Sequence, residues 1–125
     1  MNVFDKLKEV LMEILDIEDR EIGPETYIIR ELDAESIDLL ELAVAIGSEF
    51  DIEVNDDEIF MKELRPFVSE SEEKGKALVQ GLVEKYPFIS NERAKEIISD
   101  LDDGPVLKVK DLAGYVAWIR EHEQK

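Results

Sequence analysis

Residues 31–42 have the sequence ELDAESIDLLEL, and this stretch is the most informative part of the chain about its fold. Acidic residues precede the serine at position 36, and apolar residues follow it at helical spacing. Serine is favoured where helices begin, because its side-chain oxygen accepts a hydrogen bond from a backbone amide that the helix leaves free. Local chemistry alone therefore predicts that Ser36 is the N-cap of a helix.

Apolar residues on both sides of this stretch indicate two amphipathic helices joined by a long loop. The first helix has apolar residues at Val3, Leu7, Val10, Leu11, Ile14 and Leu15. The second begins after Ser36 and ends near Phe50, with apolar residues at Ile37, Leu40, Ala43, Val44 and Ile46. Between them, Gly23 and Pro24 interrupt regular structure. Residues 17–34 therefore predict a loop fixed to the core by apolar anchors, namely Ile22, Tyr27, Ile28, Ile29 and Leu32.

The second half of the chain predicts three further helices. A polar run at 55–57 follows the second helix, and residues 69–76, rich in Ser and Glu, are expected to be a connection. One helix is expected around Ala77, Leu78, Leu82 and Val83, and another, capped by Ser90 or Asn91, around Ala94, Ile97, Ile98 and Leu101. The last helix has Val109, Leu112, Val116 and Ile119. No segment alternates long enough to predict a strand, so the expected fold class is all-α.

Length and charge narrow the class of protein. The chain has 125 residues, 44% of them hydrophobic, which predicts one domain with its own core. It carries 15 basic and 32 acidic side chains, a net charge of -17, and residues 1–59 hold 19 of the acidic and 4 of the basic ones. Such an excess repels nucleic-acid phosphates and anionic membrane surfaces. The concentration of acidic side chains in the first half of the chain predicts docking with basic proteins instead.

The residues also argue against catalysis, a metal centre and a membrane segment. The chain has no cysteine, and its single histidine, His122, stands near the end, so a nucleophile with an adjacent base is not expected. An EF-hand loop fails at 51–57 because its central glycine and final acidic ligand are missing. The longest uncharged apolar stretch, 42–46, is too short for a bilayer, and the N-terminus is unlike a signal peptide. The sequence predicts a cytoplasmic protein that is not an enzyme.

The order of an acidic helix, a long loop, a serine at a helix start and a further acidic loop resembles the acyl carrier protein family. Glu35, Ser36 and Ile37 occupy the place of the Asp-Ser-Leu motif whose serine carries a phosphopantetheine arm in that family. The resemblance implies an acyl-carrier-like helical bundle that is monomeric. It also implies a 4'-phosphopantetheine group, taken from coenzyme A and attached to Ser36, whose thiol holds acyl groups as thioesters.

By the same resemblance, the partners are a phosphopantetheinyl transferase and acyl-transferring or condensing enzymes with basic patches. The acidic residues that match docking positions of the family are Glu35, Asp38 and Glu41. The apolar residues that could line an acyl cavity between the helices are Val10, Ile14, Ile28, Leu42, Ala43, Ile46 and Ile59. Taken one at a time, each acid is more simply explained as part of a solvated helix face and each apolar residue as ordinary core.

The chain departs from the family at several positions. Asp33 stands where glycine is usual, and aspartate is one of the few other residues that tolerate a left-handed backbone. Glu35 replaces the usual aspartate, and Gly47 and Ser48 stand where relatives often have acids. The largest departure is residues 60–104, which are expected to be a helical insertion within a single domain of residues 1–125. The insertion is either merely tolerated or adds a lid or docking surface near the acyl site.

Three functions remain open at this point. The first is an acyl carrier for a dedicated fatty-acid, lipid or polyketide-like pathway. The second is an unmodified acidic interaction module on a carrier-like fold. The third is a carrier for an amino acid or another unit, which no residue of the chain excludes.

Overall fold

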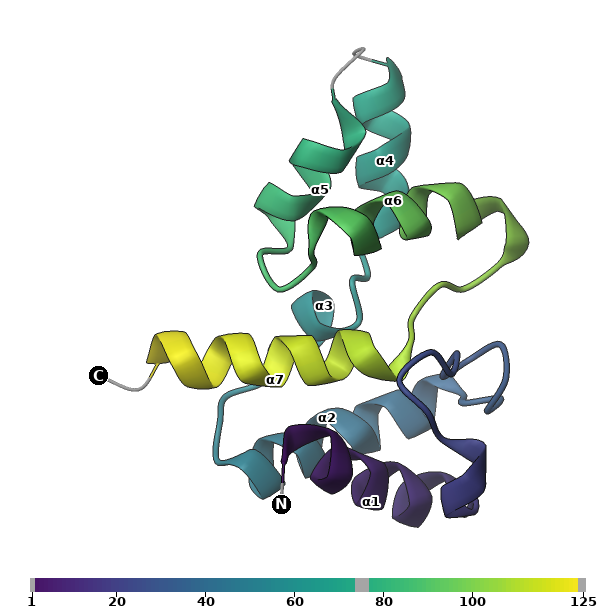
Figure 1. The fold of residues 1–125 in the computed structure, drawn as a ribbon, viewed down its shortest axis with the longest axis vertical. Helices are drawn as coiled ribbons and strands as arrows, with labels where there is room; N and C mark the ends of the chain where they lie inside the picture. Colours follow the sequence, from purple (N-terminus) through teal and green to yellow (C-terminus); the bar gives the residue numbers. More distant parts are fainter. Residues whose placement is uncertain (1, 74–76, 124–125) are drawn as a thin grey trace.

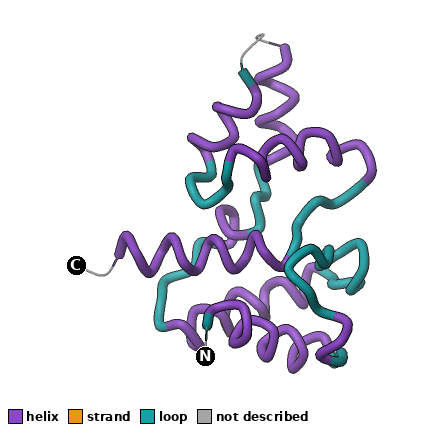
Figure 2. Tube along the Cα trace, viewed as in Figure 1, coloured by secondary structure: helices purple, strands orange, loops and turns teal. Residues whose placement is uncertain are grey.

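The structure, a computed structural model, describes residues 2–73 and 77–123 as a set of helices (Figures 1 and 2). The α-helices are α1 (Val3–Leu15), α2 (Ser36–Phe50), α3 (Asp56–Ile59), α4 (Leu64–Glu73), α5 (Leu78–Lys85), α6 (Asn91–Asp100) and α7 (Val109–Glu123). Two 3₁₀ helices, η1 (Asp19–Glu21) and η2 (Leu101–Asp103), are also present. Strand-like pairing within the described ranges is limited to an isolated bridge between Tyr27 and Lys108. The all-α prediction is confirmed.

The first two predicted helices and the last one form the lower part of the molecule together with α3 (Figure 1). Helix α1 packs against α2 and α7, and α3 contacts α2 and α7. The apolar faces expected from the spacing are buried: Leu7 and Leu11 of α1 and Leu112 and Val116 of α7 have no exposed surface. Periodicity therefore predicted correctly which sides of α1 and α7 face the core.

Aspartate residues end both α1 and α2. Asp16 and Asp51 each have a φ of 54°, in the left-handed region that aspartate tolerates better than most residues. After α2 the chain turns back closely, and the amide of Ile52 donates to the carbonyl oxygen of Gly47 at 3.1 Å. A Cβ atom at position 47 would lie 3.1 Å from the carbonyl oxygen of Ile52. Glycine at this position therefore allows the turn that leads from α2 to α3.

Two segments that the sequence predicted to be irregular are helical. The expected connection at 69–76 is helical as far as Glu73, the last residue of α4, while residues 74–76 lie outside the described residues. The buried face of α4 consists of Leu64, Val68 and Ser71. Because this face is short and includes a serine, the sequence shows no clear apolar period here. The polar run at 55–57 begins α3, because the side chain of Asn55 accepts a hydrogen bond from the amide of Glu58 at 3.1 Å.

The helices predicted around Leu82 and Ile97 are confirmed as α5 and α6. Ser90 is the N-cap of α6, and its hydroxyl oxygen accepts a hydrogen bond from the amide of Arg93 at 3.1 Å. Helices α4, α5 and α6 form the upper part of the molecule (Figure 1). Their buried side chains, which include Leu82 and Ile97 at 0% exposure, belong to the same apolar cluster as those of α1, α2 and α7. The upper and lower helices therefore share one continuous core.

Aromatic side chains join the upper helices to α7. Phe88, in the loop between α5 and α6, lies edge-on to Tyr115 of α7 with ring centroids 5.2 Å apart, and its centroid is 6.1 Å from that of Trp118. Tyr115 is fully buried, and its hydroxyl contacts the amide of Asn55 and the carboxylate of Glu58, each at 3.1 Å. Helix α7 is thus held both by α3 and by the loop between α5 and α6.

Candidate functional site

Ser36 is the first residue of α2, and its side chain is exposed. The prediction that Ser36 is the N-cap is wrong, because Glu35 occupies that position in an extended conformation. The carboxylate of Asp38 accepts a hydrogen bond from the amide of Glu35 at 2.8 Å, in the manner of a capping box. With two acidic residues capping the helix, the serine hydroxyl is not needed for this task.

The loop before α2 turns sharply so that Ser36 follows a buried anchor. Asp33 has a φ of 59°, which confirms that it adopts the left-handed backbone expected where the family has glycine. The amides of Asp33 and Ala34 donate to the carbonyl oxygens of Ile29 and Ile28 at 3.1 and 3.2 Å. Ala34 is 7% exposed. The buried alanine and the turn therefore fix the backbone immediately before the exposed serine.

The start of α2 is suited to an anion on the Ser36 oxygen. The first backbone hydrogen bond of the helix runs from the amide of Leu39 to the carbonyl oxygen of Glu35 at 3.0 Å. Amides earlier than this one point out of the helix start and have no carbonyl partner within the helix. Together with the positive end of the helix dipole, they favour a phosphate at this place. The residues present thus fit a phosphodiester on Ser36.

The three predicted docking acids differ in their surroundings. Glu35 and Glu41 are exposed, whereas Asp38 is half-buried and caps the helix. A sequence pattern could not separate Asp38 from the other two, because capping and docking both favour acidic residues at a helix start. The structure gives Glu35 and Asp38 a capping task, and it leaves the side chains of Glu35 and Glu41 exposed.

Three apolar side chains of α2 face outward. Ile37, Leu40 and Val44, which the spacing had grouped with the core face, are 64%, 53% and 74% exposed. They follow one another at intervals of three and four residues and so share one side of the helix. The available signal was the number of apolar residues in α2: from Ile37 to Ile46 they surround the helix almost completely, more than one buried face requires.

The candidate acyl-cavity residues are packed in the core. Leu42, Ile46, Ile28 and Ile59 have no exposed surface, and Ala43 and Val10 are 5% and 7% exposed. The remaining candidate, Ile14, is half-buried against the same cluster. The structure therefore brings the seven residues into one apolar cluster, and their use as an acyl cavity stays a prediction.

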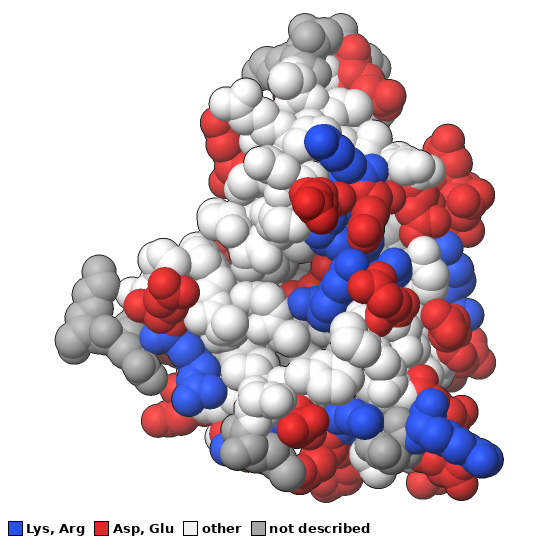
Figure 3. Space-filling view, in the orientation of Figure 1, with Lys and Arg blue, Asp and Glu red and all other residues white. Residues whose placement is uncertain are grey.

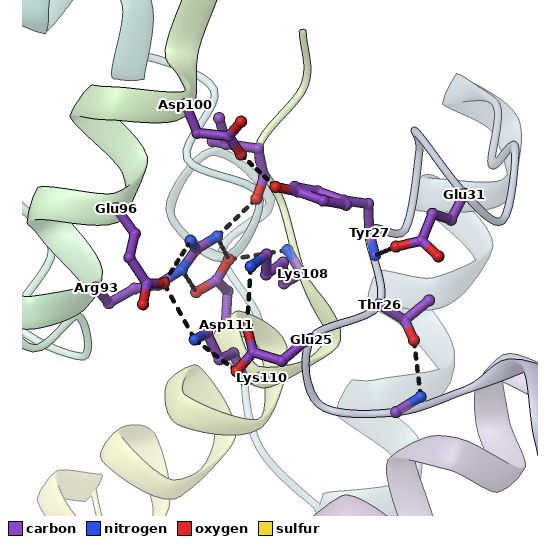
Figure 4. A network of polar contacts seen from close by, with 12 residues as sticks. Glu25, Thr26, Tyr27, Glu31, Arg93, Glu96, Asp100, Lys108, Lys110 and Asp111 are labelled. Carbon is purple, nitrogen blue, oxygen red and sulfur yellow. Dashed lines mark hydrogen bonds and ion pairs between the residues drawn. The ribbon is translucent and has the colours of Figure 1, made fainter. Parts of the chain in front are cut away.

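Polar side chains tie the loop, α6 and the start of α7 together (Figure 4). We call them the junction network, and its members are Glu25, Tyr27, Arg30, Arg93, Glu96, Asp100, Lys108, Lys110 and Asp111. At its centre, the Nε and Nη2 atoms of Arg93 donate to the two carboxylate oxygens of Asp111, both at 2.8 Å. Arg93 and Asp111 are 5% and 2% exposed, so this ion pair is buried.

The outer part of the junction network reaches the loop that precedes Ser36. The ammonium groups of Lys108 and Lys110 both donate to Glu25 at 2.9 Å, and Lys110 also donates to Glu96 at 3.2 Å. In Figure 3, Lys and Arg side chains gather beside acidic ones in the middle of the visible face, where the upper and lower helices meet. These contacts hold α6 and the start of α7 against the loop.

A second set of contacts in the junction network joins Tyr27 and Arg30 of the loop to Asp100 at the end of α6. The hydroxyl of Tyr27 donates to Asp100, and the guanidinium of Arg30 donates to the same carboxylate at 3.1 Å while lying 4.0 Å from the ring of Tyr27. The hydrogen bond from Tyr27, followed by that from Arg30, lowers the pKa of Asp100. The end of α6 is therefore fixed to the loop.

The junction network predicts that the fold loses stability in acid. Hydrogen bonds from Lys110 and Lys108 lower the pKa of Glu25 from 4.5 to about 2. Because the pKa is depressed in the folded state, this stabilisation is complete above pH 4.5 and is lost as the pH falls toward 2. Thermal unfolding followed by circular dichroism should show a melting temperature that falls through this range and a smaller fall in Glu25→Gln.

The matched control for this pH experiment is Glu13→Gln. Glu13 is an exposed carboxylate of α1 outside the junction network. Its replacement should leave the slope of melting temperature against pH between 4.5 and 2 unchanged. Equal slopes in the wild type and in Glu25→Gln would contradict the assignment.

His122 lies exposed in the last turn of α7 with its Nδ1 atom 2.8 Å from the carbonyl oxygen of Trp118, which agrees with a residue placed near a helix C-terminus. Over residues 2–73 and 77–123, no three His, Cys, Asp or Glu side chains are grouped so that they could hold a metal ion. In the same part of the chain, no helix combines the length and apolarity that crossing a membrane requires.

Comparison with known proteins agrees with this geometry. Residues 5–63 match the family model of a phosphopantetheine attachment site, so the helical bundle and the start of α2 define a phosphopantetheine-binding protein. An acyl carrier protein of Picosynechococcus sp. (strain ATCC 27264 / PCC 7002 / PR-6) is 42% identical over 55 residues, which are 44% of this chain and 68% of that relative. The acyl carrier protein of Nitratidesulfovibrio vulgaris (strain DP4) is 38% identical over 58 residues, or 46% of this chain and 76% of that protein.

The chain therefore belongs to the acyl carrier protein family, as the resemblance implied. Membership implies a covalently attached 4'-phosphopantetheine group and, as partners, a phosphopantetheinyl transferase and enzymes that handle acyl groups. The match to the family model ends at residue 63, immediately before α4. Helices α4 to α7 lie outside it.

Proposed function

We propose that Ser36 is the attachment site of the 4'-phosphopantetheine arm and that the protein carries acyl groups for a dedicated fatty-acid, lipid or polyketide-like pathway. The observation that carries this proposal is the exposed Ser36 hydroxyl at the first position of α2. A phosphate on this oxygen would lie beside backbone amides that the helix leaves without partners. Asp38 and Glu35 cap the helix on their own, so modification of the serine would cost no capping hydrogen bond.

The arm, when attached, supplies a terminal thiol that holds acyl groups as thioesters. The chain has no cysteine, so it has no thiol of its own that could compete for the acyl group. The residues around Ser36 bind and orient the arm rather than change bonds. We infer that the protein acts as a substrate of enzymes and is not itself a catalyst.

We further propose that α2 is the docking face for these enzymes. Glu35 and Glu41 offer negative charge to basic patches, and the exposed stripe of Ile37, Leu40 and Val44 offers apolar contact beside them. Charged side chains at the rim of an interface mainly accelerate encounter, while apolar side chains at its centre hold the partner. A surface with both features on one helix suits a carrier that binds its partners and then leaves.

The arrangement of the core supports a proposal about the domain organisation. We propose that residues 1–125 form one domain and that residues 60–104 are an insertion within it. The support for this proposal is that the buried residues of α4 to α6 and those of α1, α2 and α7 belong to one apolar cluster. Such an arrangement favours cooperative unfolding of the whole chain.

The attachment site is tested by intact mass after incubation with coenzyme A and a phosphopantetheinyl transferase. The wild type should gain the mass of one phosphopantetheine, and Ser36→Ala should gain none. Ser48→Ala is the matched control, because Ser48 is another exposed serine of α2, and it should be modified like the wild type. A wild type that gains no mass would favour the unmodified acidic interaction module instead.

A further inference from the structure

A cleft of about 280 Å³ lies between α3 and the end of α5, two elements that Figure 1 labels. Its lining residues are Asn55, Asp57, Glu58, Glu63, Lys85 and Tyr86. None of them belongs to the docking face proposed on α2. Lys85 and Tyr86 follow residue 63, where the match to the family model ends. Part of the cleft wall is therefore formed by residues that the family model does not describe.

The hydroxyl of Tyr86 is buried at this cleft without a hydrogen-bond partner. Tyr86 is 3% exposed, and among residues 2–73 and 77–123 no group pairs with its hydroxyl in hydrogen-bond geometry. The backbone of Glu63 lies nearby but outside that geometry. A buried hydroxyl without a partner costs stability, and a ligand that pairs with it removes this cost.

Carboxylates surround the Tyr86 hydroxyl. Burial, followed by the negative charges of Glu63, Asp57 and Glu58, raises the pKa of Tyr86 to about 12. These three acids are also the acids of the lining, so the hydroxyl end of the ring points toward the cleft. Because the pKa is raised, the hydroxyl stays neutral at pH 7, and its oxygen can accept a hydrogen bond from a ligand.

The lining has more negative charge than its own cations neutralise. It contains three carboxylates and one ammonium group, a net charge of -2. The ammonium of Lys85 donates to Glu63 at 3.1 Å, and Glu58 accepts a hydrogen bond from the hydroxyl of Tyr115 through one of its two oxygens. Asp57 has only a loose ion pair with Lys62, 4.0 Å long and exposed. The cleft therefore attracts a cation that has several donors.

The arrangement of the acids favours a planar organic cation over a metal ion. Within the two described ranges, no three acidic side chains are grouped so that they could hold a metal ion. A guanidinium group has five N–H donors in one plane and is more weakly hydrated than an ammonium, so it can reach separated acceptors. At ~30 Å³ for a water molecule, the cleft has on the order of nine such volumes, which is enough room for an arginine side chain.

We propose that this cleft binds the guanidinium of an arginine side chain on a partner protein, with the Tyr86 oxygen and the carboxylates of Asp57 and Glu58 as acceptors. Asn55, Asp57 and Glu63 are exposed, so the opening is accessible to a polypeptide. The site goes beyond the proposed carrier function and does not depend on attachment at Ser36. Through Tyr86, a partner recognises this chain by a residue outside the match to the family model.

The experiment titrates the unmodified protein, labelled in its tyrosine rings, and follows the NMR signals. The probes are ethylguanidinium and the peptide acetyl-Gly-Arg-Gly-amide. The chain has three tyrosines, and both probes should shift the ring signals of Tyr86 while those of Tyr27 stay in place. Tetramethylammonium has the same charge but no N–H donor. At equal concentration it should leave the signals of Tyr86 unchanged.

Substitutions test the acceptors separately. In Tyr86→Phe both probes should bind about tenfold more weakly, the loss expected for one hydrogen bond to a charged group, with binding followed by the amide signals of α3. Without a probe, the melting temperature of Tyr86→Phe should equal or exceed that of the wild type, because an unpaired buried hydroxyl is removed. Asp57→Asn should bind several-fold more weakly. Glu84→Gln loses the same charge at an exposed position of α5 outside the lining, and it should bind like the wild type.

Three results would overturn the proposal. Equal shifts with tetramethylammonium would mean that the acidic surface attracts any cation. A lower melting temperature of Tyr86→Phe without a probe would mean that the hydroxyl stabilises the fold rather than serving a ligand. Binding of ethylguanidinium without binding of the peptide would exclude a partner protein as the source of the guanidinium. Because the protein is unmodified, these results are independent of the mass gain that tests Ser36.

Discussion

Replacing Arg93 by alanine is expected to lower the free energy of unfolding by about 3–5 kcal/mol, the range for breaking a buried ion pair. The guanidinium makes two 2.8 Å hydrogen bonds to Asp111 and one of 2.6 Å to the carbonyl oxygen of Val106. Its removal leaves the Asp111 carboxylate, which is 2% exposed, without a cation in the core. Urea unfolding followed by far-ultraviolet circular dichroism measures the loss.

The control for this substitution is Lys95→Ala. Lys95 lies on α6 two residues from Arg93, but it is exposed, so its removal should change the free energy of unfolding by less than about 0.5 kcal/mol.

The fluorescence of Trp118, the single tryptophan of the chain, reports on the contact between α7 and Phe88. Fluorescence and circular dichroism should give the same midpoint, because buried residues of α4 to α6 and of the other helices belong to one apolar cluster.

Two results would contradict this account. A loss in Arg93→Ala no larger than that in Lys95→Ala would mean that the buried pair does not stabilise the fold. A separate transition, seen by circular dichroism before the tryptophan signal changes, would mean that α4 to α6 unfold independently of α1, α2 and α7.

Local sequence signals were sufficient to predict much of the fold. The apolar spacing of α1 and α7 predicted their buried faces, because such faces must lie against other elements. Ser90 was predicted as one of two possible caps of α6, and the structure places it there. Asp33 was expected in the left-handed region, and it adopts a φ of 59°. In each case the residue type and its near neighbours determine the conformation.

The features of the fold that local sequence could not predict depend on contacts between residues far apart in the chain. The excess of apolar residues in α2 signals that one side is exposed, but which side that is depends on the elements that cover the helix, and local spacing does not give it. The contact between Tyr27 and Asp100 joins positions 73 residues apart. Helix α4 was missed because its buried face includes Ser71, a polar residue that periodicity counts as exposed.

Reversing the charge of Glu41 to lysine is expected to reduce the kcat/KM of a phosphopantetheinyl transferase for this protein about tenfold at low salt, the low end of what electrostatic steering contributes. Glu41 is exposed on α2 and stands beside Leu40, which is 53% exposed, so a basic partner approaching Ser36 meets both. The difference from the wild type should shrink as ionic strength rises, because salt screens exposed charges. Initial rates of mass gain over a series of salt concentrations measure this effect.

Glu9→Lys is the matched control, since it makes the same change of charge at an exposed position of α1. If only the net charge of the protein mattered, both variants would slow loading equally, and the assignment of α2 as the docking face would fail.

The apolar half of the face is probed by Val44→Ser, which removes a side chain that is 74% exposed and should leave the melting temperature unchanged. Because apolar contact persists in salt, the rise in KM for Val44→Ser should remain at high ionic strength, where the effect of Glu41→Lys has faded.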